Sequence, residues 1–320
     1  MACVASIVIR RSVKMKKLDS LHQPPFNTCL VGAVKGALDY FDCNVSVAAT
    51  FGGSGHAFLV NIHEQLCPSG PYCWKYEEFY PLVRNLGLEM VELGFCHNGS
   101  TPEERMAMEQ KVREYLDQGQ PCAVGNMDNQ LIYSYDDNKF LMAQPWDACC
   151  ETTPPSLTFE TWKEFGEEIH AVFWTFRKTP AKDESSIIRD SLRYALDLFQ
   201  NPEKHSFEHF ATGLAAYDNW AKAVEAGYGA SHGSWWNAMV WSECRAMAGA
   251  WFEELAAKHN NISSQAHKLS GMYKEIAANL EKISNKEMDS GEKIRIIRDV
   301  KAMEQEAIIN IKDLLTVFDR

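Results

Sequence analysis

A glutamine and a cysteine near the start of the chain have the types and spacing that thiol chemistry needs. Gln23 precedes Cys29 by six residues. The residues after Cys29 place Leu30 and Val34 on one face of a helix predicted over 28–41. A helix N-terminus favours the thiolate, and a glutamine amide together with the cysteine N–H can hold an oxyanion. The pattern predicts a nucleophile at Cys29; the alternative is a small apolar residue of the core.

A glycine-rich segment offers the first candidate for a base. Residues 51–58 read Phe-Gly-Gly-Ser-Gly-His-Ala-Phe, without the Gly-Lys-Ser/Thr of a phosphate loop and without the last glycine of a nucleophile elbow. Three glycines within four residues indicate a tight turn or the close approach of a ligand. We therefore predict that Gly53, Ser54 and Gly55 bind a ligand and that His56 is a base. The alternative is a structural turn that carries a surface histidine.

A second candidate base is His170, at the start of an alternating segment predicted as a strand over 170–177. As a lone residue it could equally be structural. Two motifs only partly match metal sites. His63 and Cys67 have the spacing of the zinc motif His-Glu-x-x-His with a cysteine in second place, and the cysteines at 149–150 are adjacent. Because no third ligand is evident, we predict no metal and no other cofactor.

Composition limits the class of protein. The chain has 320 residues, 46% of them hydrophobic, and a net charge of −11. At about 150 residues per domain, this length predicts two domains. The acidic balance argues against a nucleic-acid partner, because phosphate binding needs clustered lysine and arginine. No apolar run reaches the ~18 residues that span a bilayer, so no membrane partner is predicted.

The N-terminal segment and the cysteines predict a cytoplasmic protein. Apolar residues 1–9 precede two arginines, which is the reverse of the order in a signal peptide. Met15 is an alternative start, so residues 1–14 are expected to be peripheral. The ten cysteines form no even, tight framework and are expected to stay reduced.

The pattern of apolar residues changes near residue 180. Before it, a helix is predicted over 102–118, and strands over 88–93, 121–125, 131–135, 139–143 and 170–177. After it, apolar residues repeat at spacings of three and four residues, which predicts about five helices. These lie near 185–200, from Phe207 to Val224, from Trp236 to Leu255, near 264–285 and from Ile294 to Phe318. The linker is predicted at 178–183, with Asp183 as the next N-cap. Tryptophans at 235–251 are typical of a bundle core or a dimer interface, so the sequence is compatible with a homodimer.

Several motifs together resemble one family. Residues 29–33 read Cys-Leu-Val-Gly-Ala, residues 67–70 read Cys-Pro-Ser-Gly, and residues 213–220 read Gly-Leu-Ala-Ala-Tyr-Asp-Asn-Trp. With the glycine-rich segment, these resemble prokaryotic proteins that join a domain related to bacteriocin-leader (double-glycine) cysteine peptidases to a C-terminal helical domain. The N-terminal acyltransferase domain of butirosin biosynthesis protein H is more distantly similar. The resemblance implies an α+β fold with a papain-like domain over 15–178, followed by an all-α helical bundle over 183–320.

The resemblance also implies that two triad members are absent. The leader peptidases use a cysteine, a histidine at the start of a strand and an aspartate before a proline, and Cys29 matches the first. Asp128 stands where the histidine would be, and Gln144-Pro145 stands where the aspartate would be. Cys29 therefore loses its usual activation unless the fold brings His56 or His170 within hydrogen-bond reach.

Two functions compete on these grounds. In the first, a cysteine-dependent hydrolase or acyltransferase uses Cys29 to attack an amide or thioester of a small molecule or peptide, with Gln23 in the oxyanion hole. In the second, a non-catalytic protein keeps the cleft and holds a small ligand with the glycine-rich segment, Asp128 and Tyr133. A third, purely structural role predicts no well-formed cleft beside Cys29.

Overall fold

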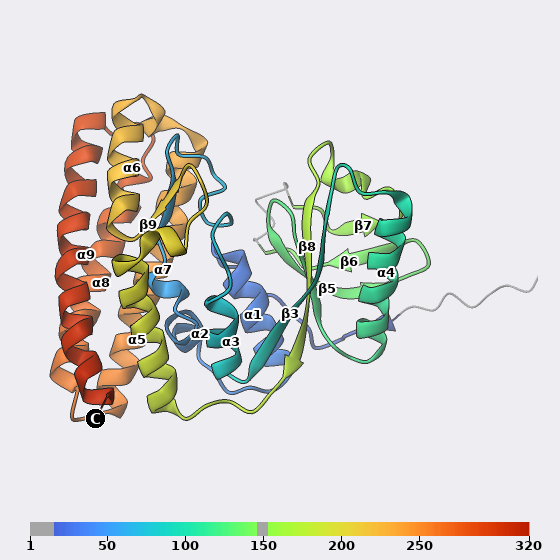
Figure 1. Cartoon of the computed structure of the whole chain (residues 1–320), viewed down its shortest axis with the longest axis horizontal. Helices are drawn as coiled ribbons and strands as arrows, with labels where there is room; N and C mark the ends of the chain where they lie inside the picture. Colours follow the sequence, from blue (N-terminus) through green and yellow to red (C-terminus); the bar gives the residue numbers. More distant parts are fainter. Residues whose placement is uncertain (1–15, 146–152, 320) are drawn as a thin grey trace, which may run out of the picture.

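The computed structural model describes residues 16–145 and 153–319. The predictions for residues 1–14 and for the cysteines at 149–150 lie outside them. An antiparallel sheet occupies one end of the molecule and long helices occupy the other (Figure 1). The α+β class is confirmed. Among the described residues, no helix combines the length and the apolar character that crossing a bilayer requires.

The sheet has seven strands in the order β3-β8-β4-β5-β6-β7, with β1 paired to β5. All the pairs are antiparallel. The strands are β1 (Lys16–Lys17), β3 (Leu88–His97), β4 (Cys122–Gly125), β5 (Asn129–Tyr135), β6 (Lys139–Met142), β7 (Ser156–Thr158) and β8 (His170–Lys178). The five predicted strands are confirmed. β1 and β7 were not predicted, because two or three residues are too short to show alternation.

Helices cover both sides of the sheet. On the outer side lies α4 (Pro102–Asp117), which begins with a capping box between Thr101 and Glu104 and confirms the helix predicted there (Figure 1). On the side facing the other helices lies α1 (Cys29–Tyr40), which packs on β5 and confirms the helix predicted at 28–41. Gly36 permits this packing, because a Cβ there would lie 2.7 Å from Leu131 Cδ1.

The long helices follow the predicted linker. They are α5 (Glu184–Gln200), α6 (Gly213–Glu225), α7 (His232–Lys258), α8 (Ser263–Ile283) and α9 (Ser290–Phe318). Asp183 caps α5 as predicted, since its side chain accepts a hydrogen bond from Ser186 N–H. The helix predicted from Phe207 was wrong at its start. Residues 210–212 form the strand β9 (Phe210–Thr212), which pairs with β2 (Asn61–His63), so α6 begins later.

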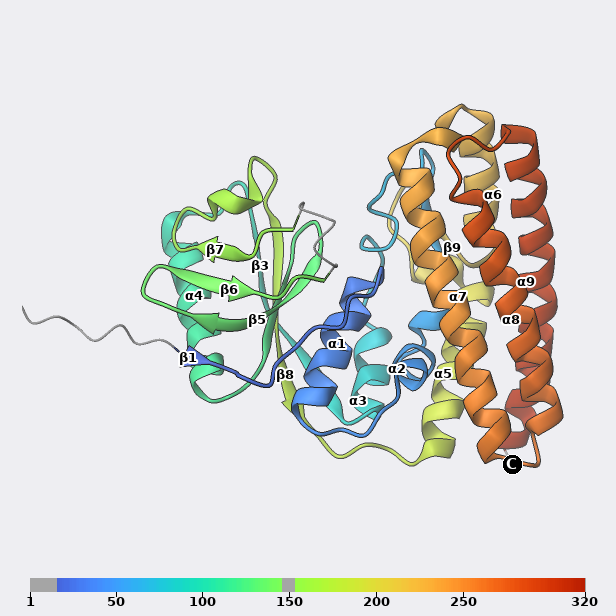
Figure 2. The ribbon, with the colours of Figure 1, turned by 180° about the vertical axis from the view of Figure 1, so that it is seen from behind.

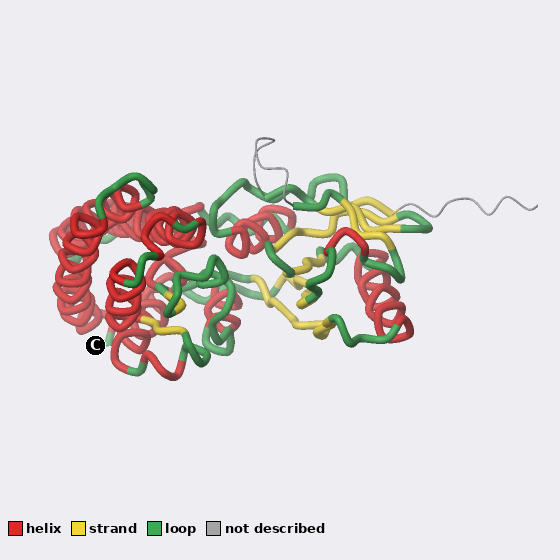
Figure 3. Tube along the Cα trace, turned by 90° about the horizontal axis from the view of Figure 1, so that it is seen from above, coloured by secondary structure: helices red, strands yellow, loops and turns green. Residues whose placement is uncertain are grey.

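The segments before and after the linker share a core. Three short elements precede the linker: the helices α2 (Val47–Gly53) and α3 (Phe79–Asn85) and the 3₁₀ turn η1 (His56–Phe58). They nevertheless pack on helices that follow it, α2 and η1 on α7, and α3 on α5. Figure 2 shows α2 beside α7, and Figure 3 shows the large sheet at one end and the long helices of the second segment at the other. Trp241 and Trp251 of α7 are buried here, as predicted for a bundle core. The division at 178–183 and the homodimer stay predictions.

Candidate functional site

Cys29 lies where the first turn of α1 meets the first residue of β5. Its side chain is fully buried. The sulfur accepts hydrogen bonds from Asn129 N–H at 3.1 Å and from Asn129 Nδ2 at 3.5 Å. A helix start and a strand start therefore converge on this thiol, and its side-chain hydrogen-bond partners are the Asn129 amide and the Tyr72 hydroxyl.

Gln23 ties these two elements together. Its Nε2 donates to Asn129 O at 2.8 Å and to Cys29 O at 3.2 Å, and its Oε1 accepts from Leu131 N–H at 2.8 Å. Both amide hydrogens are thus engaged with backbone carbonyls. The sequence correctly places Gln23 next to Cys29, but this arrangement leaves no Gln23 hydrogen to donate to the predicted oxyanion.

The N-terminus of α1 is occupied by a carboxylate from a distant helix. Glu243 of α7 accepts from Asn27 N–H at 3.0 Å and from Thr28 N–H at 2.7 Å. Burial raises the pKa of Glu243 despite these hydrogen bonds. Because these donors already face an anionic group, the helix end offers less stabilisation to a thiolate than a free terminus would.

The electrostatic environment of Cys29 favours the neutral thiol. Burial raises the pKa of Cys29 to about 12, and the nearby Asp128 charge adds to this effect against the hydrogen bonds from Asn129. Asp128 is held by Tyr72 Oη at 3.0 Å and by Thr153 Oγ1 at 3.1 Å. Asp128 is therefore part of the Cys29 surroundings and opposes ionisation of the thiol there.

Tyr133 lies farther along the same strand. It follows Asn129 by four residues of β5, which corresponds to about 13 Å of extended chain. Its backbone carbonyl accepts from Leu18 N–H. No hydrogen bond joins Tyr133 to Asp128 in the described part of the chain, so the structure does not unite this predicted ligand-binding pair.

His56 is buried against α7. Its ring lies among Trp74, Phe79 and Trp241, and Nδ1 is 3.6 Å from Cys244 Sγ. The alternative, a surface histidine, was therefore wrong. Burial lowers the pKa of His56 to about 3, with a smaller contribution from the positive charge of Arg245. His56 thus faces a different cysteine from the one for which it was proposed as a base.

His170 is exposed at one end of β8, paired with His97 of β3. Its N–H donates to Asn126 Oδ1 at 2.8 Å. The ten histidines all fall within the described residues, and none of them hydrogen-bonds to Cys29 Sγ. The structure therefore brings neither predicted base to the thiol.

The glycine-rich segment is packed against the protein's own side chains. A Cβ at Gly53 would lie 2.7 Å from Leu86 Cδ2, and one at Gly55, where φ is +75°, would lie 2.4 Å from the Tyr194 ring. Ser54 is buried and donates to Phe51 O. The predicted close approach to the glycines is present. It is made by the side chains of Tyr194 on α5 and of Leu86 after α3, and not by a ligand. These residues are closed to a ligand in this arrangement.

Two residues of the site were missed from the sequence. Asn129 is adjacent to the position that the resemblance assigns to a histidine, so a one-residue shift would have found it. Glu243 lies more than 200 residues from the helix that it caps, and no local pattern indicates it. Within the described ranges, no three metal-binding side chains are grouped to hold an ion.

A cavity of about 620 Å³ opens at the later part of α1, between this helix and α2, α5 and α7. Its charged lining consists of three lysines and three carboxylates: Lys35, Lys182, Lys258, Asp39, Glu184 and Glu254. Cys29 is not among the lining residues. The structure therefore provides a ligand-sized space at a distance from the thiol.

No family model matches the chain, and no curated protein matches it. The relationship to double-glycine cysteine peptidases therefore remains a prediction from the motifs.

Proposed function

We propose that this chain is a non-catalytic binding protein whose first segment is a papain-like domain without a working thiol triad. One observation carries the proposal: the side chains that hydrogen-bond to Cys29 are the amide of Asn129 and the hydroxyl of Tyr72, and neither is an imidazole. An amide cannot accept the thiol proton, so it cannot replace the imidazole that activates a cysteine nucleophile.

The state of the thiol supports the same proposal. Burial raises the pKa of Cys29 to about 12, so the thiol is neutral at pH 7. The thiolate is the reactive species, and no histidine hydrogen-bonds to this sulfur to act as a general base. The capped α1 terminus and the engaged Gln23 amide remove two further aids to acyl chemistry.

One observation favours the competing function, a thiol hydrolase or acyltransferase. Asn129 points two N–H groups at the sulfur, and donors of this kind stabilise a thiolate. If substrate binding displaced Glu243 from the helix terminus, the thiol would gain further stabilisation. This alternative requires a Cys29 that reacts readily near neutral pH.

Alkylation separates the two functions. Iodoacetamide labelling from pH 6 to pH 9, followed by site-resolved mass spectrometry, measures each cysteine separately. We expect Cys29 to label at least tenfold more slowly than half-buried Cys67, with no inflection in this range. Rapid labelling with an inflection well below the ~8.5 of a free thiol would refute the non-catalytic proposal.

A variant expected to make Cys29 more reactive tests whether the first segment is papain-like. Asn129→His places an imidazole beside Cys29 Sγ, and Asn129→Gln is the matched control that keeps an amide. We expect the histidine variant alone to speed Cys29 labelling by at least tenfold, because an imidazole can take the proton. Equal rates for both variants would contradict the proposal that residue 129 faces the thiol as the base of a papain-like site does.

A further inference from the structure

We infer that the cavity beside the later part of α1 binds a small zwitterion with an apolar body, of the class of free hydrophobic amino acids and dipeptides. This inference rests on the proposed binding function and names its ligand. The cavity volume of about 620 Å³ lies within the range that encloses small ligands. The elements that form it, α1, α2, α5 and α7, come from both sides of the linker and converge in Figures 1 and 2.

Lys35 supplies a buried positive charge. It stands on an otherwise apolar stretch of α1, and its side chain is only 10% exposed. Its partner is Asp39 one turn later, whose side chain is 52% exposed. An ammonium group has three hydrogens to donate, and lysine is rarely buried without full pairing. A carboxylate of the ligand would complete the hydrogen bonding of this group.

Glu254 supplies the opposite charge. It lies half-buried on α7, and its Oε2 accepts from Ser46 Oγ at 2.7 Å. In the described part of the chain, its other oxygen has no hydrogen-bond partner, which leaves it available to an amino group. A ligand with an ammonium at one end would therefore be held by Glu254 while its carboxylate faces Lys35.

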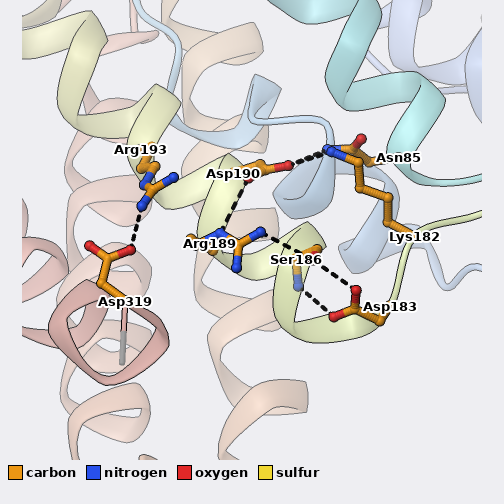
Figure 4. A network of polar contacts seen from close by, with 8 residues as sticks. All are labelled: Asn85, Lys182, Asp183, Ser186, Arg189, Asp190, Arg193 and Asp319. Carbon is orange, nitrogen blue, oxygen red and sulfur yellow. Dashed lines mark hydrogen bonds and ion pairs between the residues drawn. The ribbon is translucent and has the colours of Figure 1, made fainter.

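The two other lysines of the lining are each paired with a carboxylate. Lys258 bonds to Glu184 at 3.0 Å, and Lys182 bonds to Asp190 at 2.9 Å. Figure 4 shows Lys182 beside Asp190 and Asn85, where the linker enters α5. These pairs engage the outer lysines. The ligand would therefore be selected by Lys35, which Asp39 binds with one oxygen, and by Glu254.

The apolar wall accounts for the body of the ligand. It is formed by Leu86, Ile187, Trp251 and Leu255 among others. Gly53 lies directly behind it, since a Cβ there would meet Leu86 and Ile187. The glycine-rich segment therefore serves ligand binding indirectly: it lets this wall pack closely without contacting the ligand.

Calorimetry on the full chain tests the inference with L-leucine, L-phenylalanine and the dipeptide Leu-Leu as probes. Two matched analogues of leucine each lack one charge: 4-methylpentanoate has no amino group, and 3-methylbutylamine has no carboxylate. We expect at least one zwitterion to bind with quenching of Trp251 fluorescence. For leucine, both analogues should bind at least tenfold more weakly.

Variants locate the site. Lys35→Met and Glu254→Gln should each weaken binding at least tenfold, whereas Lys301→Met, which breaks an ion pair with Asp218 elsewhere, should leave it unchanged. If Lys35→Met does not fold, Glu254→Gln decides. Failure of all three probes to bind at millimolar concentration, equal binding of the analogues, or unchanged binding in the folded cavity variants would overturn the inference.

Cys29→Ala separates this inference from the proposed function. Binding should survive this change, because Cys29 does not line the cavity. An unreactive Cys29 with no zwitterion binding refutes the ligand assignment alone. A reactive Cys29 with intact binding refutes the non-catalytic function and leaves the cavity site standing.

Discussion

Acidification from pH 7 to pH 5 should destabilise the folded protein by about 2 kcal/mol through His56 alone. The imidazole is 1% exposed, and its Nε2 has no hydrogen-bond partner among the described residues. The groups that face it are the rings of Trp74, Phe79 and Trp241 and, from α7, Cys244 with the neighbouring Arg245. None of these is an anion, so a proton on His56 would be buried without compensation.

The sign and size of this loss of stability follow from the pKa values of His56 in the folded and unfolded chain. Burial lowers the pKa of folded His56 to about 3, against 6.5 for the ordinary imidazole. The unfolded chain therefore takes up this proton first. The stability due to His56 is complete above pH 6.5 and is lost as the pH falls towards 3. Each pH unit below 6.5 costs about 1.4 kcal/mol until the pH nears 3, which amounts to about 2 kcal/mol at pH 5 and about 4 kcal/mol at pH 3.

The assay is urea unfolding at pH 7, 6 and 5, followed by tryptophan fluorescence and circular dichroism. Carboxylates also titrate in this range, so the free energy of unfolding of the wild type is compared with that of His56→Phe. The phenylalanine ring suits the aromatic surroundings of residue 56. We expect the variant to lose about 2 kcal/mol less than the wild type between pH 7 and pH 5. His22→Gln, at an exposed histidine without an ion pair among the described residues, is the control and should match the wild type. A His56→Phe curve parallel to the wild type within about 0.5 kcal/mol would refute the reasoning.

Two further predictions concern the packing of α7. Arg245 is fully buried, bonds to Glu304 and donates to the carbonyls of Ala57 and Leu59 at 2.9 and 2.6 Å. Arg245→Met should lower the free energy of unfolding by about 3–5 kcal/mol, because it leaves the Glu304 carboxylate without its cation. Adding Glu304→Leu should recover much of that loss in urea unfolding, and no recovery would contradict the ion-pair explanation. Gly52→Ala should cost about 3 kcal/mol, because the new Cβ would lie 2.1 Å from the Trp251 ring. Its control is Gly271→Ala on α8, which meets nothing within 4 Å and should be neutral or stabilising; equal losses in thermal unfolding would refute the packing argument.

Local patterns predicted the elements well where they were long and periodic. The helix at 102–118 has a proline at its first turn and a glycine after its end, and the strand at 170–177 alternates over its length. Such signals depend only on neighbouring residues, so the sequence displays them directly. The start of α6 was misplaced because β9 exists only through its pairing with β2, some 150 residues earlier.

The sequence also determined that Cys29 begins a helix beside Gln23 and that the glycine-rich segment is a place of close approach. It could not determine which groups lie against these residues. Trp251 and Tyr194 lie against the glycines, Glu243 caps α1, and His56 meets Cys244.

These partners are separated by more than 130 residues, and only the folded chain brings them together. The protonation states of Cys29 and His56 depend on burial, and burial is a property of the whole packed structure. The residues able to do chemistry are thus visible in the sequence, whereas the tertiary structure alone decides whether their surroundings allow it.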